Sequence, residues 1–524
     1  MSEAVDRGIT VTEIASMDQP IKVCPETTAA FVGRALRGPL NTPVLVENFG
    51  EFRRRFGDVW GRSSLGPAAK QFFEHDGKRL YIVRVANNAR GAMLCLPARG
   101  SALIMRAIEP GSTEYVRAAI DYDGIGDDVD EFFNLTLQRV NPVTGFVIDQ
   151  EFFRELSWME AADSFVADAL LTSAIARVER PHPTHRPERT LAAGSIYQSI
   201  FVDPVQAGTD GVELTDYDLI GSRRDRSGLF ALEQTEQFDV LYLPPPGKGR
   251  DAGPAAVLAA DMYSRERGAV LIVDPLSEWK TVADAAAGVR ELGYASPNML
   301  GYFPRVTERS SEDSVPRPAG GAIAGLLCRQ DRTHGPWLKL DQEARGLHRR
   351  LRPVVELDAR DGRLLNRAGL NAVMRGSAGR TRLSGSVTMG RGTGTHRSFA
   401  KLPVRRFSLQ LINTIAHGTR WAVFERGDAA LAERIRGQIL TYLNGLNDLG
   451  AFASDGFFVR CDAGVSKRSV GGEHGVTILL VFHPVGCDEP ISLTLHQDAS
   501  GFRATSAAFA PTLFGSTEPD GERY

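Results

Sequence analysis

The sequence has 524 residues, more than one hydrophobic core can organise, and this length predicts about two to four domains. A hydrophobic content of 43% and a charged content of 24% are ordinary for a globular chain, and the net charge of -3 gives no general attraction to nucleic acid or to an anionic membrane. No apolar run reaches the roughly 20 residues that span a bilayer, and the N-terminus lacks a signal-peptide pattern. Because the five cysteines form no CxxC pair, we expect free thiols and synthesis in a reducing cytoplasm.

The N-terminal stretch, up to about Pro25, alternates weakly and carries too little apolar surface for a core of its own. We expect an extended arm that pairs with the edge of a sheet, and the alternative is a disordered terminus. After it, Thr27–Val46 predicts two strands joined by a Gly/Pro loop. Helices are expected at Asn48–Gly57 and Leu65–Gly77, and a buried strand at Lys78–Val85.

From Ala86 to about Gly208 the sequence pattern changes from alternating helices and strands to short strands. Short β-like runs such as Glu114–Asp123 and Phe132–Val140 are separated by Gly, Asp and Pro. A proline-rich connection, Glu179–Thr190, lies near the end of this region. The pattern predicts an inserted module that is mostly β and resembles a sandwich.

An α/β pattern returns after the inserted module. Buried runs bounded by Pro and Gly alternate with helical stretches, which predicts parallel strands joined by crossover helices. The expected strands are Phe238–Pro246, Ala269–Pro275 and Asn298–Val306, and the expected helices are Ala255–Gly268, Thr281–Gly293 and Ala319–Gly335.

The C-terminal part is expected to be α+β. Two amphipathic helices, Val404–Gly418 and Ala429–Gly450, flank the segment GTRWAVFE, which we expect to be a core strand. Asp428 and Gly450 are the expected caps of the second helix. Further strands are expected around FFVRCD and at His474–Pro484 and Pro490–Asp498, and the polar tail from Ala499 is expected to be loosely ordered.

The motifs that resemble catalytic or ligand sites do not complete one. The glycine-rich Met389–Arg397 lacks the spacing of a phosphate loop, and the acidic Asp121–Glu131 lacks the spacing of a calcium loop. His417 stands in an HGT sequence similar to the histidine motif of subtilisin-like proteases, but no nucleophile motif follows it. We therefore predict no catalytic, cofactor or metal site, and a structural or assembly role for the chain.

Several segments resemble the contractile tail sheath family in the order in which that family carries them. Thr27–Gly57 and Gln71–Val85 are similar to its N-terminal signature, a strand–loop–strand, a helix ending in Phe-Gly and a strand ending in VRV. Gly208–Glu233 and Asn366–Arg375 resemble two central segments, and GTRWAVFE and FFVRCD resemble the closing motifs. The inserted module and the tail after about Asp498 resemble the family least.

The resemblance implies a subunit of a phage tail, tailocin or related injection machine that forms stacked hexameric rings around an inner tube. It implies a middle domain with a subtilisin-like fold and no catalytic triad. The implied partners are further copies of the chain, an inner tube protein, and baseplate and tail terminator proteins, without nucleic acid or membrane insertion. The implied location is a virion or injection-particle tail assembled in a bacterial cytoplasm. The alternatives are a hydrolase with an unrecognised site and a baseplate component that shares sheath-like domains.

The resemblance also implies site residues and domain boundaries. Inter-subunit strand pairing is expected for Thr10, Val11, Thr12, Glu13, Ile14, Val476, Ile478, Leu480, Ile491, Leu493 and Leu495, with Val476–Phe482 as the receiving edge. Contact with an acidic tube is expected for Arg405, Arg406, Arg434 and Arg436, which could equally be ordinary solvated helix charges. The expected domains are an arm (1–24), an N-terminal core part (25–86), the inserted module (87–208), the subtilisin-like domain (209–400), the C-terminal domain (401–498) and a tail (499–524).

Overall fold

The computed structural model describes Ile21 and residues 27–126, 128–194, 199–308, 315–340, 346–376, 379–390, 397–425, 428–465, 474–498 and 501–507. The predicted arm residues Thr10–Ile14 lie outside this set. The chain divides into two compact units, one made of residues 26–333 and 340–391 and the other mainly of residues 392–524. Within the described residues, no helix is both long and apolar enough to cross a membrane.

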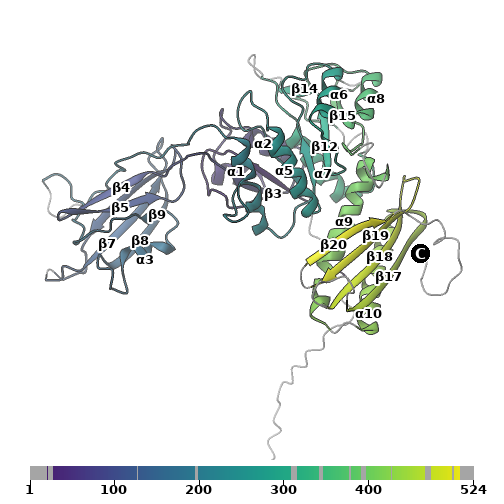
Figure 1. Cartoon of the computed structure of the whole chain (residues 1–524). Helices are drawn as coiled ribbons and strands as arrows, with labels where there is room; N and C mark the ends of the chain where they lie inside the picture. The colour runs from purple at the N-terminus through teal and green to yellow at the C-terminus, as the bar shows by residue number, and fades with distance from the viewer. Residues whose placement is uncertain are drawn as a thin grey trace, which may run out of the picture. The chain divides into compact units, whose positions relative to one another are not determined.

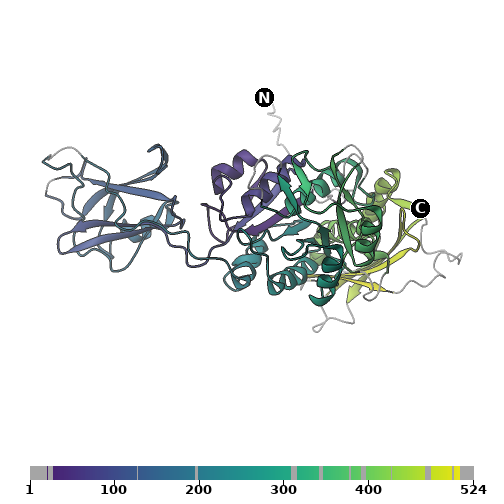
Figure 2. The same cartoon turned by 90° about the horizontal axis from the view of Figure 1, so that it is seen from above.

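A mixed sheet of eight strands forms the body of the first unit (Figures 1 and 2). Six neighbouring strands run parallel, and β16 and β2 are antiparallel at its two edges. The order is β16 (Thr381–Ser384), β15 (Leu370–Arg375), β12 (Met299–Phe303), β11 (Val270–Val273), β10 (Val240–Tyr242), β1 (Thr28–Gly33), β3 (Arg79–Arg84) and β2 (Val44–Val46).

Helices cover both faces of this sheet, and its central strands are therefore buried on both sides. On one face, Phe31 meets Phe72 of α2 with ring centroids 5.7 Å apart. Gly321 of α7 packs so closely on α2 that a Cβ there would lie 2.2 Å from the Ala68 carbonyl oxygen. The opposite face shares one core with α5, α6 and α8. The helices are α1 (Phe49–Phe56), α2 (Leu65–Glu74), α4 (Asp216–Ile220), η2 (Gly228–Gln234), α5 (Pro254–Glu266), α6 (Val282–Glu291), α7 (Gly320–His334) and α8 (Ala359–Arg367), and a small ribbon pairs β13 (Val306–Glu308) with β14 (Leu351–Pro353).

The inserted module lies between β3 and β10 in the sequence and consists mainly of two three-stranded antiparallel sheets. Their apolar residues form one shared core that includes Leu94, Met105, Ile120, Phe133 and Leu137. One sheet is β4 (Met93–Ala98), β5 (Ser101–Ala107) and β9 (Ala176–Val178), the other is β6 (Tyr115–Asp121), β7 (Phe132–Val140) and β8 (Val147–Ser157), and the short helices are α3 (Val166–Ala169) and η1 (Leu170–Thr172).

The second unit packs two long helices on one face of a four-stranded antiparallel sheet (Figure 1). The expected N-cap is confirmed, because the Asp428 carboxylate accepts the backbone N–H of Leu431 at 2.9 Å. Gly450, just past the helix, adopts a φ of 75°, which suits glycine at this position. The elements are η3 (Arg397–Ala400), α9 (Leu402–Gly418), η4 (Arg420–Phe424), α10 (Ala429–Asp448), β17 (Phe452–Val465), β18 (His474–Pro484), β19 (Ile491–Asp498) and β20 (Gly501–Ala507).

Two expectations for this unit were wrong. GTRWAVFE is not a core strand, since Arg420–Phe424 forms the 3-10 helix η4 directly after α9. The backbone N–H of Thr419 donates to the Ile415 carbonyl at 2.9 Å and that of Ala422 to the Thr419 carbonyl at 3.0 Å, which continues the helical path, and Phe424 is 90% exposed. The start of the tail is ordered, because Gly501–Ala507 pairs with β19 as a fourth strand.

Candidate interaction surfaces

The C-terminal sheet has the strand order β17-β18-β19-β20. Its inner strand β18 is hydrogen-bonded to β17 on one side and to β19 on the other. Among the described residues, the open backbone edges of this sheet therefore belong to β17 and β20. An open edge offers unpaired N–H and C=O groups to a strand from another chain.

The predicted strand-pairing residues that the structure describes lie on the two inner strands. Val476, Ile478 and Leu480 of β18 are buried against α9 and α10, as are Ile491, Leu493 and Leu495 of β19. The expected receiving edge, Val476–Phe482, is occupied on both sides within this chain. A strand from a neighbour would reach this sheet at β17 or β20 unless a resident strand is displaced. Inter-subunit pairing of these residues stays a prediction.

The four predicted tube-facing arginines lie on α9 and α10, and none of them is fully exposed. The guanidinium of Arg405 lies over the Phe399 ring at 4.8 Å, and that of Arg434 over the Trp421 ring at 4.2 Å. Arg436 donates to Glu433 at 2.7 Å, and Arg406 is buried. These side chains are engaged within their own unit, so an acidic tube would have to compete with those contacts. Their role at a tube surface stays a prediction.

The junction between the inserted module and the α/β body depends on a buried arginine. The Arg84 guanidinium, at the end of β3, donates to the carbonyl oxygens of Ala35 at 3.1 Å and Pro110 at 2.7 Å, and also to those of Leu36 and Gly38. Burial lowers the pKa of Arg84 from its ordinary value. One side chain thus ties the loop after β1 to a loop of the module.

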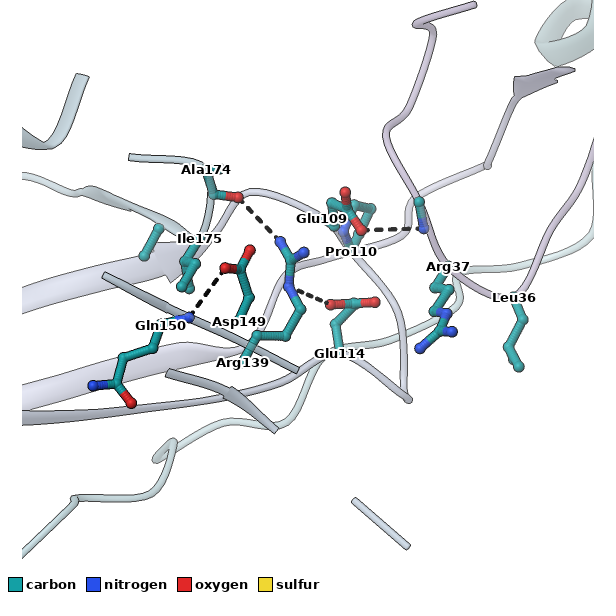
Figure 3. A network of polar contacts seen from close by, with 12 residues as sticks. Leu36, Arg37, Glu109, Pro110, Glu114, Arg139, Asp149, Gln150, Ala174 and Ile175 are labelled. Carbon is teal, nitrogen blue, oxygen red and sulfur yellow. Dashed lines mark hydrogen bonds and ion pairs between the residues drawn. The ribbon is translucent and has the colours of Figure 1, made fainter. Parts of the chain in front are cut away.

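A second set of contacts at the junction involves carboxylates of the module (Figure 3). The Gly38 N–H donates to Glu109 at 3.2 Å. Arg139 of β7 pairs with Glu114 at 3.2 Å and donates to the Ala174 carbonyl at 3.0 Å. Burial raises the pKa of Glu114 although Arg139 opposes that shift. Sequence reasoning missed this junction, because its partners are far apart in the chain.

One polar cluster lies at the carboxyl ends of β10 and β11, where α/β folds commonly carry their active sites. Tyr242 donates to Asp274 at 2.8 Å, Arg305 pairs with Asp251, and the Ser277 hydroxyl donates to Asp251 at 2.8 Å. Burial raises the pKa of Asp274 to about 7. None of these contacts involves a histidine, so the described cluster lacks the base that a serine hydrolase requires.

His417 is exposed in the last turn of α9, in the other unit of the chain. A catalytic histidine needs a carboxylate that orients its ring and a nucleophile within hydrogen-bond reach. Among the described residues, no group of three or more His, Cys, Asp or Glu side chains could hold a metal ion.

Comparison with solved structures finds sheath proteins that match more than nine tenths of the chain. A sheath tail protein from Listeria innocua superposes with a TM-score of 0.59 at 13% identity, covering 92% of this chain and 97% of that one. A sheath tail protein from Desulfitobacterium hafniense gives 0.53 at 13%, with 94% and 99% covered. The contracted helical sheath of the anti-feeding prophage gives 0.52 at 14%, with 93% and 98% covered.

The chain has the fold of contractile tail sheath proteins. No protein-family model and no curated protein matches the sequence. The sheath fold in this chain is a mixed α/β, multidomain arrangement with several separate sheets. The ordered motifs of the sequence pointed to this fold, although identity to the solved sheath proteins is only 13 to 14%.

Proposed function

We propose that this chain is the structural subunit of a contractile tail sheath. Copies polymerise as stacked hexameric rings around an inner tube, and the sheath shortens to drive the tube through a target envelope. The observation that carries this proposal is the end-to-end match of the fold, which covers more than 90% of both partners in three comparisons with sheath proteins. A shared catalytic domain alone would match only part of each chain.

The C-terminal unit supports the proposed assembly through its open edges. Strands β17 and β20 end the sheet among the described residues, and backbone pairing there could link subunits without a specific side-chain lock. We propose that the terminal arms of neighbouring copies add strands to this sheet. We propose that such links keep neighbouring subunits joined while the sheath shortens.

The α/β body supports a scaffold role. Its central parallel sheet with helices on both faces fits the proposed subtilisin-like fold, and the described polar cluster at Asp274 lacks a histidine. We propose that contraction is driven by a lower free energy of the shortened lattice, in which subunits bury more surface. The extended sheath is then a metastable state, and no nucleotide is consumed.

The proposed partners are further copies of this chain, the inner tube, and baseplate and tail terminator proteins. The proposed location is the tail of a virion or injection particle that is assembled in a bacterial cytoplasm. Purified full-length protein should form long hollow cylinders in negative-stain electron microscopy. Hydrolytic turnover that is lost in His417→Ala, by a protein that stays monomeric at all concentrations, would overturn the proposal.

A further inference from the structure

An open groove of about 500 Å³ runs between α1 and the tip of the β7–β8 hairpin of the inserted module. The loop after β1 and the helix α1 with its following residues supply one part of the lining, and the module supplies the other. The lining comprises Leu36, Arg37, Gly50, Arg53, Arg54, Gly57, Asp58, Thr113, Asn141, Pro142 and Val143.

The groove carries an excess of positive charge. Arg37 donates to the carbonyl oxygens of Arg53 at 3.2 Å and Arg54 at 2.9 Å, so its guanidinium is fixed at the C-terminal end of α1. Arg53 pairs with Asp58 at 3.0 Å. Arg54 is exposed, and its charge adds to that of Arg37 along one wall. The lining of the groove thus contains three arginines and only one carboxylate, that of Asp58.

Two buried polar atoms in this lining lack a hydrogen-bond partner among the described residues, Nε of Arg37 and Oγ1 of Thr113. Buried polar groups in proteins are rarely left without a partner, and each one calls for an explanation. On the facing wall, Val143 is 91% exposed at the hairpin tip. The groove therefore offers the positive charge of its arginines and an apolar contact to an acidic segment from outside the subunit.

The walls of the groove are held together by the two contacts that cross the junction, from the Gly38 N–H to Glu109 and from Arg84 to the Pro110 carbonyl. Figure 3 shows Arg37 from the body beside Glu109, Glu114 and Arg139 from the module. Within the module, Arg139 lies in β7 one residue before the strand ends, and it pairs with Glu114 at 3.2 Å. A groove that is already preorganised binds a partner with less loss of conformational entropy than a flexible groove does.

The complementary charge lies on the module itself. Residues 87–208 contain 17 Asp and Glu against 10 Arg and no Lys, whereas residues 27–86 contain 10 Lys and Arg against 5 Asp and Glu. The β6–β7 connection carries the exposed carboxylates Asp123, Asp128 and Asp130. This connection lies at the end of β7 opposite to the hairpin, so one subunit carries an acidic end and a basic groove that are separated by the length of a strand.

We propose that the groove of one subunit binds the acidic β6–β7 connection of a second copy of this chain. The contact joins two different surfaces, so it repeats from copy to copy and suits a helical polymer rather than a closed dimer. It rests on the proposed sheath function and adds a contact between the groove of one copy and the inserted module of the next to the proposed pairing of the C-terminal sheets. Complementary charge at such a contact sets register and excludes wrong neighbours.

Charge reversal tests this contact on full-length protein. Arg54→Glu places a carboxylate in the groove, and we expect the critical concentration for cylinder formation to rise by about tenfold, because like charges then face each other. The matched control is Arg55→Glu, the next residue of α1, which is also exposed and lies outside the lining of the groove. We expect this control to form cylinders as the wild type does.

The double variant Arg54→Glu with Asp128→Arg exchanges the two charges and should recover most of the lost assembly. Sedimentation and electron microscopy measure the polymer, and circular dichroism verifies that each variant is folded. Equal loss in both single glutamate variants, or no recovery in the double variant, would overturn the contact. Failure of the proposed function would look different, because the wild-type protein itself would then form no cylinders.

Discussion

At Arg84 a buried guanidinium bonds backbone carbonyl groups from both sides of the junction between module and body. We expect Arg84→Met to lower the free energy of unfolding of this unit by about 2–4 kcal/mol, because buried carbonyl oxygens lose their donors. Urea unfolding followed by tryptophan fluorescence measures this loss. Hydrogen exchange should also become faster at Leu36 and Gly38.

The control for this prediction is Arg55→Met, which removes an exposed arginine from α1. Exposed substitutions usually change stability by less than about 0.5 kcal/mol. If Arg84→Met unfolds at the same urea concentration as the control, the guanidinium does not hold the junction.

Asp274 makes stability depend on pH. Burial raises its pKa from 3.8 to about 7 although the Tyr242 hydrogen bond and Arg305 oppose the shift. Because the folded state keeps this proton while the unfolded state releases it, stability falls as the pH rises from about 4 to 7, by at most about 1.4 kcal/mol per pH unit. Thermal unfolding of Asp274→Asn should show a flatter profile and a higher midpoint than the wild type at pH 8. Parallel profiles for the two proteins would contradict the assignment.

At the scale of elements, the 3-10 helix η4 explains which aromatic side chains of GTRWAVFE support the fold. Trp421 packs against the helical core and lies under Arg434, whereas Phe424 is 90% exposed. Trp421→Ala should destabilise the C-terminal unit by about 2–4 kcal/mol, while Phe424→Ala should stay within about 0.5 kcal/mol of the wild type. Chemical denaturation of both variants checks the pair, and a larger loss for Phe424→Ala would favour the predicted strand.

Periodicity predicted most elements of the C-terminal unit and failed at specific places. The strand His474–Pro484 has the expected bounds, since eleven residues of mostly apolar character stand between turn signals. The run WAVF was misread because four apolar residues show no period, and the preceding helix continues as 3-10 turns. Strand β20 was missed because Gly501–Ala507 contains few apolar residues, and its partner β19 supplies the order.

At the scale of the whole molecule, the order of the sheath-like motifs along the sequence predicted the fold. Local hydrophobic patterns predicted the alternation of strands and helices. The sequence did not reveal that β1 lies between β3 and β10, so that segments on both sides of the module build one sheet. Strand order across an insertion of more than a hundred residues depends on packing between distant segments. The junction at Arg84 and the basic groove result from that packing between distant segments, and no local sequence pattern predicts either of them.

If the N-terminal arm links subunits as proposed, assembly depends on residues that belong to neither of the two hydrophobic cores. Removing residues 1–20 should abolish cylinders while the two folded units keep their circular dichroism spectrum, because the lost segment would pair only with a neighbour. Electron microscopy and sedimentation measure the polymer. Normal cylinders from the truncated chain would refute the arm and leave the rest of the proposal to be judged separately.

The most direct test of the sheath proposal is a helical reconstruction of cylinders formed by the purified full-length protein. We predict a hollow cylinder of stacked six-membered rings, with the two C-terminal helices that carry Arg405, Arg406, Arg434 and Arg436 toward the lumen. Neighbouring copies should share strands at β17 or β20. A closed oligomer without helical symmetry, or a cylinder with those two helices facing away from the lumen, would contradict the account.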